Sequence, residues 1–150
     1  MIYNSQIEII SGLSKTQFKS FCSTFFHLLG LTNINAVLIR ENGVITGKGT
    51  INLGIVMSYH FVFFGKQHVG AVPDNIIQEI REIMDKETDK GLVLTTGYFT
   101  REAKRQAKIK GKPPIDLIDR SNLIERLKKY NLRISIDTGE VFLTDKEKKP

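Results

Sequence analysis

The segment 91–100 carries residue types that can bind a phosphate group. Leu92, Val93 and Leu94 form an apolar run typical of a buried strand, and a hydroxyl-rich turn and a basic helix follow it. Backbone amides, hydroxyls and cations gathered at one strand end stabilise a phosphate. The predicted phosphate contacts are Thr95, Thr96, Thr100, Arg101, Lys104, Arg105 and Lys108, with Lys48 added from the glycine-punctuated segment 47–54. The threonines also have a structural use, because they can close the turn and cap the helix.

The charge of the chain is concentrated at one end. Residues 1–100 hold eight Lys/Arg and eight Asp/Glu, whereas residues 101–150 hold fourteen and eight, so the whole formal charge of +6 comes from the last third. Clustered cations attract polyanions, which makes nucleic acid a plausible partner, although a solvated lysine-rich surface would look the same.

The length and cysteine content suit one soluble domain inside the cell. A chain of 150 residues with 41% hydrophobic content can bury a single core. The lone Cys22 cannot form an internal disulfide, and no apolar segment approaches the ~20 residues of a membrane helix. We expect a cytoplasmic protein with one domain over residues 1–143 and a charged flexible tail over 144–150.

Hydrophobic periodicity predicts alternating helices and strands. Residues 1–10 alternate loosely and suggest an edge strand or an arm, and a turn is expected around Met57-Ser58. Ser14, Thr100 and Ser121 are the expected helix caps. Helices are expected over 15–29, 74–84, 101–109 and 122–130, and strands over 36–39, 55–57, 59–64, 92–95 and 115–118, with a hairpin over 132–143. This order predicts an α/β fold with a central sheet flanked by helices.

Several of these features recur together in a known family. They are the Leu29-Gly30 pair that ends a helix, the segment 47–52, Lys66 at a strand end, the segment 91–100 with Ala103 and Ala107, and the strand 117–119 before Leu123 and Leu127. In this order, from about residue 13 to residue 127, they resemble the Mrr-type restriction endonucleases. The resemblance implies a restriction-endonuclease-like, PD-(D/E)XK fold, in which a central mixed β-sheet is flanked by α-helices.

The same resemblance implies a nuclease centre whose acids are replaced here. The family's helix acid falls at Phe18-Lys19, its strand Asp at Asn52, its Gln or Glu at Phe64 and its Lys at Lys66. Only the lysine matches, so Lys66 and Asn52 are the degenerate catalytic positions. Neutral and cationic groups do not satisfy Mg²⁺, which takes oxygen ligands and prefers carboxylates, whereas they suit a phosphate. We therefore expect no metal and no cofactor.

Three functions remain open at this stage. The first is a pseudo-nuclease or recognition subunit that binds duplex DNA without cutting it alone, as a homodimer or beside a companion nuclease subunit. The second is an active Mg²⁺-dependent endonuclease with a relocated carboxylate, for which Glu79 and Glu82 are the nearest candidates by chain order. The third is a protein-interaction module that keeps only the fold, with the strand surface 59–64 as its interface.

Overall fold

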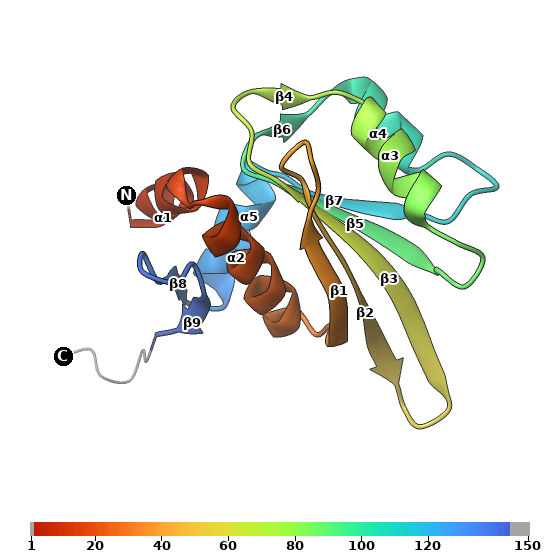
Figure 1. Cartoon of the computed structure of the whole chain (residues 1–150), viewed down its shortest axis with the longest axis horizontal. Coiled ribbons are helices and arrows are strands. Elements are labelled where there is room, and N and C mark those ends of the chain that lie inside the picture. Colours follow the sequence, from red (N-terminus) through yellow and green to blue (C-terminus); the bar gives the residue numbers. More distant parts are fainter. Residues whose placement is uncertain (1, 145–150) are drawn as a thin grey trace.

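The computed structural model describes residues 2–144 and is organised by one mixed β-sheet (Figure 1). The helices are α1 (Ile2–Gly12), α2 (Lys15–Leu28), α3 (Asn75–Ile83), α4 (Arg101–Ala107) and α5 (Arg120–Lys129). The strands are β1 (Thr32–Ile39), β2 (Ile45–Leu53), β3 (Met57–Lys66), β4 (Ala71–Val72), β5 (Lys90–Thr95), β6 (Tyr98–Phe99), β7 (Ile115–Ile118), β8 (Leu132–Ile134) and β9 (Val141–Leu143).

The main sheet has five strands in the order β1-β2-β3-β5-β7. β1, β2 and β3 pair antiparallel, and β3, β5 and β7 pair parallel. Parallel strands need crossover connections, and here α3 leads from β3 to β5 while α4 leads from β5 to β7. The predicted central sheet flanked by helices is therefore confirmed.

Helices cover both faces of this sheet. On one face, α1, α2, α5 and the β8–β9 hairpin enclose a core that includes Phe63 of β3. On the other face, α3 and α4 enclose a second core that includes Phe64. Successive strand residues point to opposite faces, so these two phenylalanines serve different cores. The ring of Phe26 on α2 lies 4.7 Å from that of Phe63, measured between centroids.

A glycine allows α2 to lie directly on β3. A Cβ atom at Gly65 would overlap the Cys22 sulfur and come within 3.2 Å of the Phe18 ring. Cys22 is fully buried there, and burial raises the pKa of its thiol. This close contact fixes α2 beside the end of β3 where Lys66 is located.

Two of the predicted helix caps are confirmed and one is replaced. Ser14 and Gln17 form a reciprocal capping box at the start of α2, and the Thr100 hydroxyl accepts a hydrogen bond from the Ala103 amide of α4. Ser121 does not cap α5. The N-cap is Asp119, whose carboxylate accepts from the Asn122 amide, because the helix begins one residue before Ser121.

The N-terminal prediction is wrong, because residues 2–12 form a helix rather than an edge strand or an arm. Tyr3, Ile7 and Ile10 recur at the three- and four-residue spacing of a helix, and this spacing outweighs the loose alternation seen in sequence. Ile7 and Ile10 are fully buried in the same core as α2 and α5.

The predicted turn in the long hairpin is also wrong. Residues 54–56, not Met57-Ser58, form the turn between β2 and β3, and Gly54 has the positive φ of 69° that this turn requires. The expected strand over 55–57 does not exist as a separate element, because Leu53 pairs directly with Met57. β1 is longer than expected, beginning at Thr32 and containing two irregular pairings with β2.

Thr144 is the last residue that the structure describes. Thr144 donates through its backbone amide and its hydroxyl to the Asn131 carbonyl, so it belongs to the packed structure. The charged tail predicted from 144 otherwise falls on residues 145–150, which lie outside the described part of the chain. Within the described part, no helix has the length and apolar character needed to cross a bilayer.

The close approach at Gly65 leads to a stability prediction. Gly65→Ala is expected to lower the free energy of unfolding by roughly 1–3 kcal/mol, because the new methyl group overpacks the contact with Cys22. Urea unfolding followed by circular dichroism measures the change. The control is Gly12→Ala at the end of α1, where a Cβ atom meets nothing within 4 Å and stability should not fall. Equal effects of the two substitutions would contradict the packing argument.

Candidate functional site

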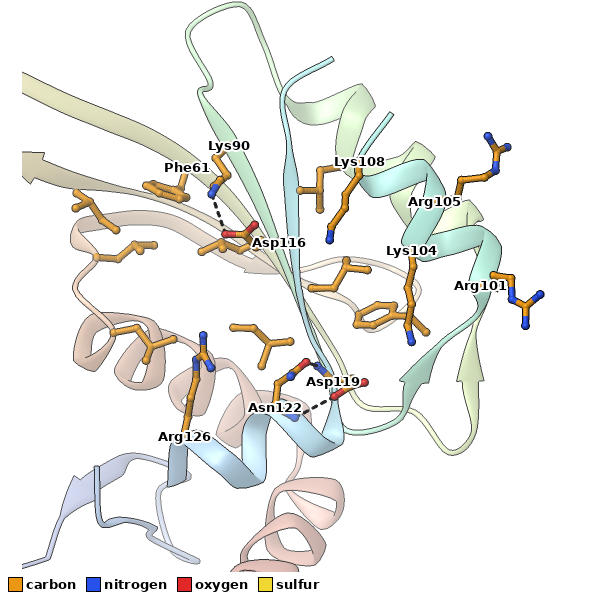
Figure 2. Close-up of a pocket in the computed structure, with 18 of the residues that line it drawn as sticks. Phe61, Lys90, Arg101, Lys104, Arg105, Lys108, Asp116, Asp119, Asn122 and Arg126 are labelled. Atoms are coloured by element: carbon orange, nitrogen blue, oxygen red, sulfur yellow. Dashed lines mark hydrogen bonds and ion pairs between the residues drawn. The ribbon is translucent and has the colours of Figure 1, made fainter. Parts of the chain in front are cut away.

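A large groove follows the free edge of β7 (Figure 2). β7 is the last strand of the sheet, so its outer edge has no strand partner. The groove has a volume of about 1030 Å³, and α4 lines one side while α5 lines the other. Its floor is apolar and includes Phe61, Leu92 and Ile118. The groove is thus open along one side and has polar walls over an apolar base.

Three interactions position α4 beside this groove. Ala103 and Ala107 are almost fully buried against the sheet, where their small side chains permit close packing. Thr100 caps the first turn, as described above. At the other end, the Arg81 guanidinium of α3 donates to the carbonyls of Gln106 and Pro113, at 2.9 and 2.8 Å. Partial burial lowers the pKa of Arg81. The basic helix is therefore fixed at both ends.

The four predicted basic residues of α4 and its C-cap all line the groove, but their side chains point in two directions. The side chains of Lys104 and Lys108 point into the groove, whereas those of Arg101 and Arg105 point outward (Figure 2). Arg105 is also engaged on its own helix, because its Nε and Nη2 donate to the two carboxylate oxygens of Glu102 at 2.9 and 2.6 Å. Lys104 and Lys108 are the α4 cations that a ligand in the groove would meet.

Two hydrogen bonds on the outer side of α4 lower the pKa of Glu102. The side chain of Arg105 makes the larger contribution and that of Gln106 the smaller one, and the pKa falls to about 2. The same pairing raises the pKa of Arg105. Glu102 therefore stays ionised at neutral pH and keeps Arg105 occupied.

The groove also contains charged residues that the sequence analysis did not select. Lys90 forms an ion pair with Asp116 at 3.0 Å, and Arg126 of α5 points into the groove from the side opposite α4 (Figure 2). Lys90 and Arg126 are far apart in sequence, and neither lies in a segment whose pattern predicts a binding residue. Only the packing of α5 against the sheet brings Arg126 to this groove, so the local sequence contained no signal for it.

Thr95 and Thr96 are placed inside the protein. Thr95 is fully buried, and its hydroxyl accepts from the Gly97 amide at 3.1 Å. The Thr96 hydroxyl accepts from the His68 amide at 2.9 Å and donates to the His68 carbonyl. The Thr95 side chain closes the turn after β5, and the Thr96 side chain holds that turn against the segment after β3. This is the structural use that the sequence analysis left open beside phosphate binding.

Lys48 does not join the α4 cluster. It is exposed on β2 and lines a separate small hollow with Asp85, Glu87 and Thr88. The pKa of Asp85 is lowered chiefly by hydrogen bonds from the Glu87 amide and the Thr88 hydroxyl, with Lys48 adding a smaller attraction. Lys48 therefore faces acidic residues at the α3–β5 connection, on a different part of the surface from Lys104 and Lys108.

The degenerate centre near Lys66 has a different composition from the one expected. Phe64 lies directly opposite Thr46 in the β2–β3 ladder, and Asn52 lies opposite Ser58. Asn52 is six residues beyond Thr46, which is roughly 20 Å along the strand, and its side chain accepts from the Ser58 hydroxyl. Asn52 cannot share an ion with position 64 or 66. The prediction that Asn52 lies at the same centre as Lys66 is therefore corrected, and Thr46 is the β2 residue directly opposite Phe64.

The face around Phe64 does not suit Mg²⁺. An acid that bound a metal ion together with residue 64 would have to lie on the same face of the sheet, at position 44, 46 or 48. These positions hold Val44, Thr46 and Lys48, and none of them is acidic. Phe64 is fully buried, and the Arg40 guanidinium carbon lies 5.7 Å from its ring centroid. A cation thus already lies over the Phe64 ring. In residues 2–144, no three His, Cys, Asp or Glu side chains group to hold a metal ion.

Neither candidate relocated acid builds a metal site. Glu79 is half-buried on α3 and accepts a long hydrogen bond of 3.4 Å from the Asn42 side chain, and Glu82 is exposed. Lys19 is half-buried on α2, next to Phe18, whose ring packs beside Gly65. Lys66 is half-buried at the end of β3, and its ammonium makes no hydrogen bond or ion pair with another described residue.

Comparisons with known proteins agree with this geometry at the level of fold. A family model described as a restriction endonuclease, Mrr_cat, matches residues 10–127. Among solved structures, the chain is similar to the DNA modification-dependent restriction endonuclease AspBHI, with a TM-score of 0.71 and 19% sequence identity. The match covers 91% of this chain and 37% of that one, so the chain spans little more than a third of the relative's length. A search of curated proteins finds no match.

The pairing of Arg105 with Glu102 can be tested by titration. Arg105→Ala is expected to raise the pKa of Glu102 from about 2 toward its ordinary value of 4.5, because the strongest hydrogen bond to the carboxylate is lost. Carboxyl carbon NMR over an acid titration measures the shift. Lys104→Ala is the control, since Lys104 points into the groove. An unchanged Glu102 pKa in the Arg105 variant would show that the ion pair does not form in solution.

Proposed function

Because the chain belongs to the Mrr-type restriction endonuclease family, we propose that it binds duplex DNA and does not cleave it alone. The observation that carries this proposal is the cross-strand pair of Thr46 and Phe64. Thr46 and Phe64 occupy the positions from which acidic side chains would have to bind a metal ion beside Lys66. Without the acids, no metal activates water or offsets charge on a scissile phosphate.

The cations of the site support DNA binding. The Lys66 ammonium makes no hydrogen bond or ion pair with another described residue. Lys104, Lys108 and Arg126 converge on the groove beside β7. The formal charge of +6 strengthens attraction to a polyanion at a distance. A lysine that contacts a phosphate releases condensed counterions, which gives binding a steep dependence on salt. In this proposal, Lys104 and Lys108 contact the backbone of the duplex.

The protein would act as a recognition or pseudo-nuclease component of a larger DNA-processing assembly. AspBHI, as its name states, is a restriction endonuclease that depends on DNA modification, and the present chain matches little more than a third of it. The described residues offer cations for the phosphate backbone, and such contacts carry no sequence information. A companion protein or domain would supply the choice of sequence and the cleavage.

A binding experiment with charge-matched variants tests the interface. Lys104→Ala combined with Lys108→Ala should weaken binding to a short duplex roughly tenfold to hundredfold at ~0.1 M salt, and lower the slope of log affinity against log salt by about 2. Fluorescence anisotropy over a series of salt concentrations measures both quantities. The control combines Lys86→Ala with Lys128→Ala, which removes the same charge from exposed positions outside the groove. Equal losses in the two double variants would assign the effect to net charge alone.

A cleavage experiment tests the loss of the nuclease centre. We expect no nicking of supercoiled plasmid in Mg²⁺ or Mn²⁺, and no binding of either ion by calorimetry, because Thr46 and Phe64 provide no carboxylate. Lys66→Ala controls for contaminating nucleases, since it removes the lysine that an active centre would need. Metal-dependent nicking that disappears in this variant would contradict the proposal. A loss of that activity in Glu79→Gln as well would identify a relocated acid.

A further inference from the structure

The tip of the β2–β3 hairpin is a two-stranded ribbon without neighbours. The pairing of β1 with β2 ends at Thr32 and Thr50, and the pairing of β5 with β3 begins at Lys90 and Phe61. Residues 51–59 therefore pair only with each other, and the ribbon extends beyond α2 and β1 (Figure 1). An isolated two-stranded hairpin is marginally stable in water.

The two faces of this ribbon differ in chemistry. Cross-strand partners share a face, so the pairs Ile51–Tyr59 and Leu53–Met57 place four apolar side chains on one side. The opposite side presents polar residues: Thr50, Asn52, Ser58 and His60. Leu53, Met57 and Tyr59 are 46, 53 and 44% exposed. Such alternation is typical of a sheet that buries one face. Ile51 is partly buried against the core, whereas Leu53, Met57 and Tyr59 remain exposed in the described structure.

This apolar face continues into the floor of the groove. Ile51 of β2 and Phe61 of β3 are diagonal neighbours on that side of the hairpin. Both line the groove, together with Leu31 and Leu92. At the far end, the turn residues Ile55 and Val56 are fully or almost fully exposed. The surface is therefore a continuous apolar strip from the core of the protein to the tip of the hairpin.

The hairpin carries no formal charge. No Asp, Glu, Lys or Arg occurs between Gly49 and Gly65, although 25% of the chain is charged. Soluble proteins usually place lysines or other charges on exposed strands to prevent association. Two copies of a chain with a charge of +6 repel each other, and this strip is a surface where they can meet without bringing like charges together.

We propose that the apolar face of residues 51–59 is the contact surface of a homodimer. The two-fold axis would pair the ribbon of one copy with that of the other, as in an isologous interface. The exposed apolar residues of the ribbon are Leu53, Ile55, Val56, Met57 and Tyr59. A contiguous apolar patch of a few hundred Å² marks an interaction site, and a stable interface buries ~800 Å² per partner.

The chemistry of the ribbon favours a second copy over other partners. A membrane-surface segment or a DNA-inserting wedge combines apolar side chains with cations of the same segment, and residues 49–65 contain no Lys or Arg. The proposal does not rest on DNA binding, since Lys104 and Lys108 lie on α4, whereas the ribbon is the end of the β2–β3 hairpin. The dimer can therefore be tested with DNA absent.

Two adjacent substitutions on opposite faces provide the test. Met57→Glu places a carboxylate on the apolar face, and Ser58→Glu adds the same charge to the polar face. Both positions are exposed, so both variants should fold, as circular dichroism and thermal unfolding would check. Sedimentation velocity from micromolar to hundred-micromolar protein should show a monomer–dimer equilibrium. Met57→Glu should weaken the dimer at least about tenfold, while Ser58→Glu leaves it nearly unchanged.

Three outcomes would overturn the proposal. The wild-type protein could remain monomeric over the whole concentration range. The dimer could respond equally to the two substitutions, which would place its interface elsewhere. The monomer could bind neutral phosphatidylcholine vesicles through Met57, as shown by co-sedimentation that Met57→Glu abolishes, which would assign the strip to a lipid surface. Because DNA is absent from each measurement, none of these results bears on the proposed DNA binding.

Discussion

The pairing register of β2 with β3 is the constraint on which the rest of this structure depends. With Thr46 opposite Phe64, the ladder places a neutral hydroxyl and an aromatic ring beside Lys66, and it leaves Asn52 at the distant end of the hairpin. A shift of one residue would turn each side chain to the other face and exchange the two cores. The register therefore determines the composition of the degenerate centre and the faces of the hairpin tip.

The chemistry of the molecule is divided between two surfaces. Cations gather along the β7 edge, where Lys104, Lys108 and Arg126 face a groove with an apolar floor. The hairpin from Gly49 to Gly65 has no charged residue and presents an apolar strip. Attraction to a polyanion requires surface cations, whereas association of equally charged copies requires a surface without them. The fold supplies both kinds of surface, because the β7 edge and the tip of the β2–β3 hairpin are different parts of the sheet.

Phe64 shows how burial of an aromatic side chain stabilises the sheet beside Lys66. Phe64 is fully buried in the core formed with α3 and α4, and Arg40 covers its ring. Burial of an aromatic side chain contributes to stability, whereas a buried carboxylate without a metal would carry a large desolvation cost. A phenylalanine at this position is thus compatible with a stable sheet, and it offers no oxygen ligand to Mg²⁺.

The sequence by itself determined the alternating α/β pattern, the buried strand 92–95, the caps at Ser14 and Thr100 and the concentration of basic residues after residue 100, because these follow from local periodicity and side-chain chemistry. It could not distinguish the helix at residues 2–12 from a strand, since a short apolar pattern fits both periods. Only the tertiary structure decided that Thr46, and not Asn52, lies opposite Phe64, that Arg126 joins the groove and that the Arg105 side chain points outward. Strand register and helix packing join residues distant in sequence, and local patterns carry no information about such pairings.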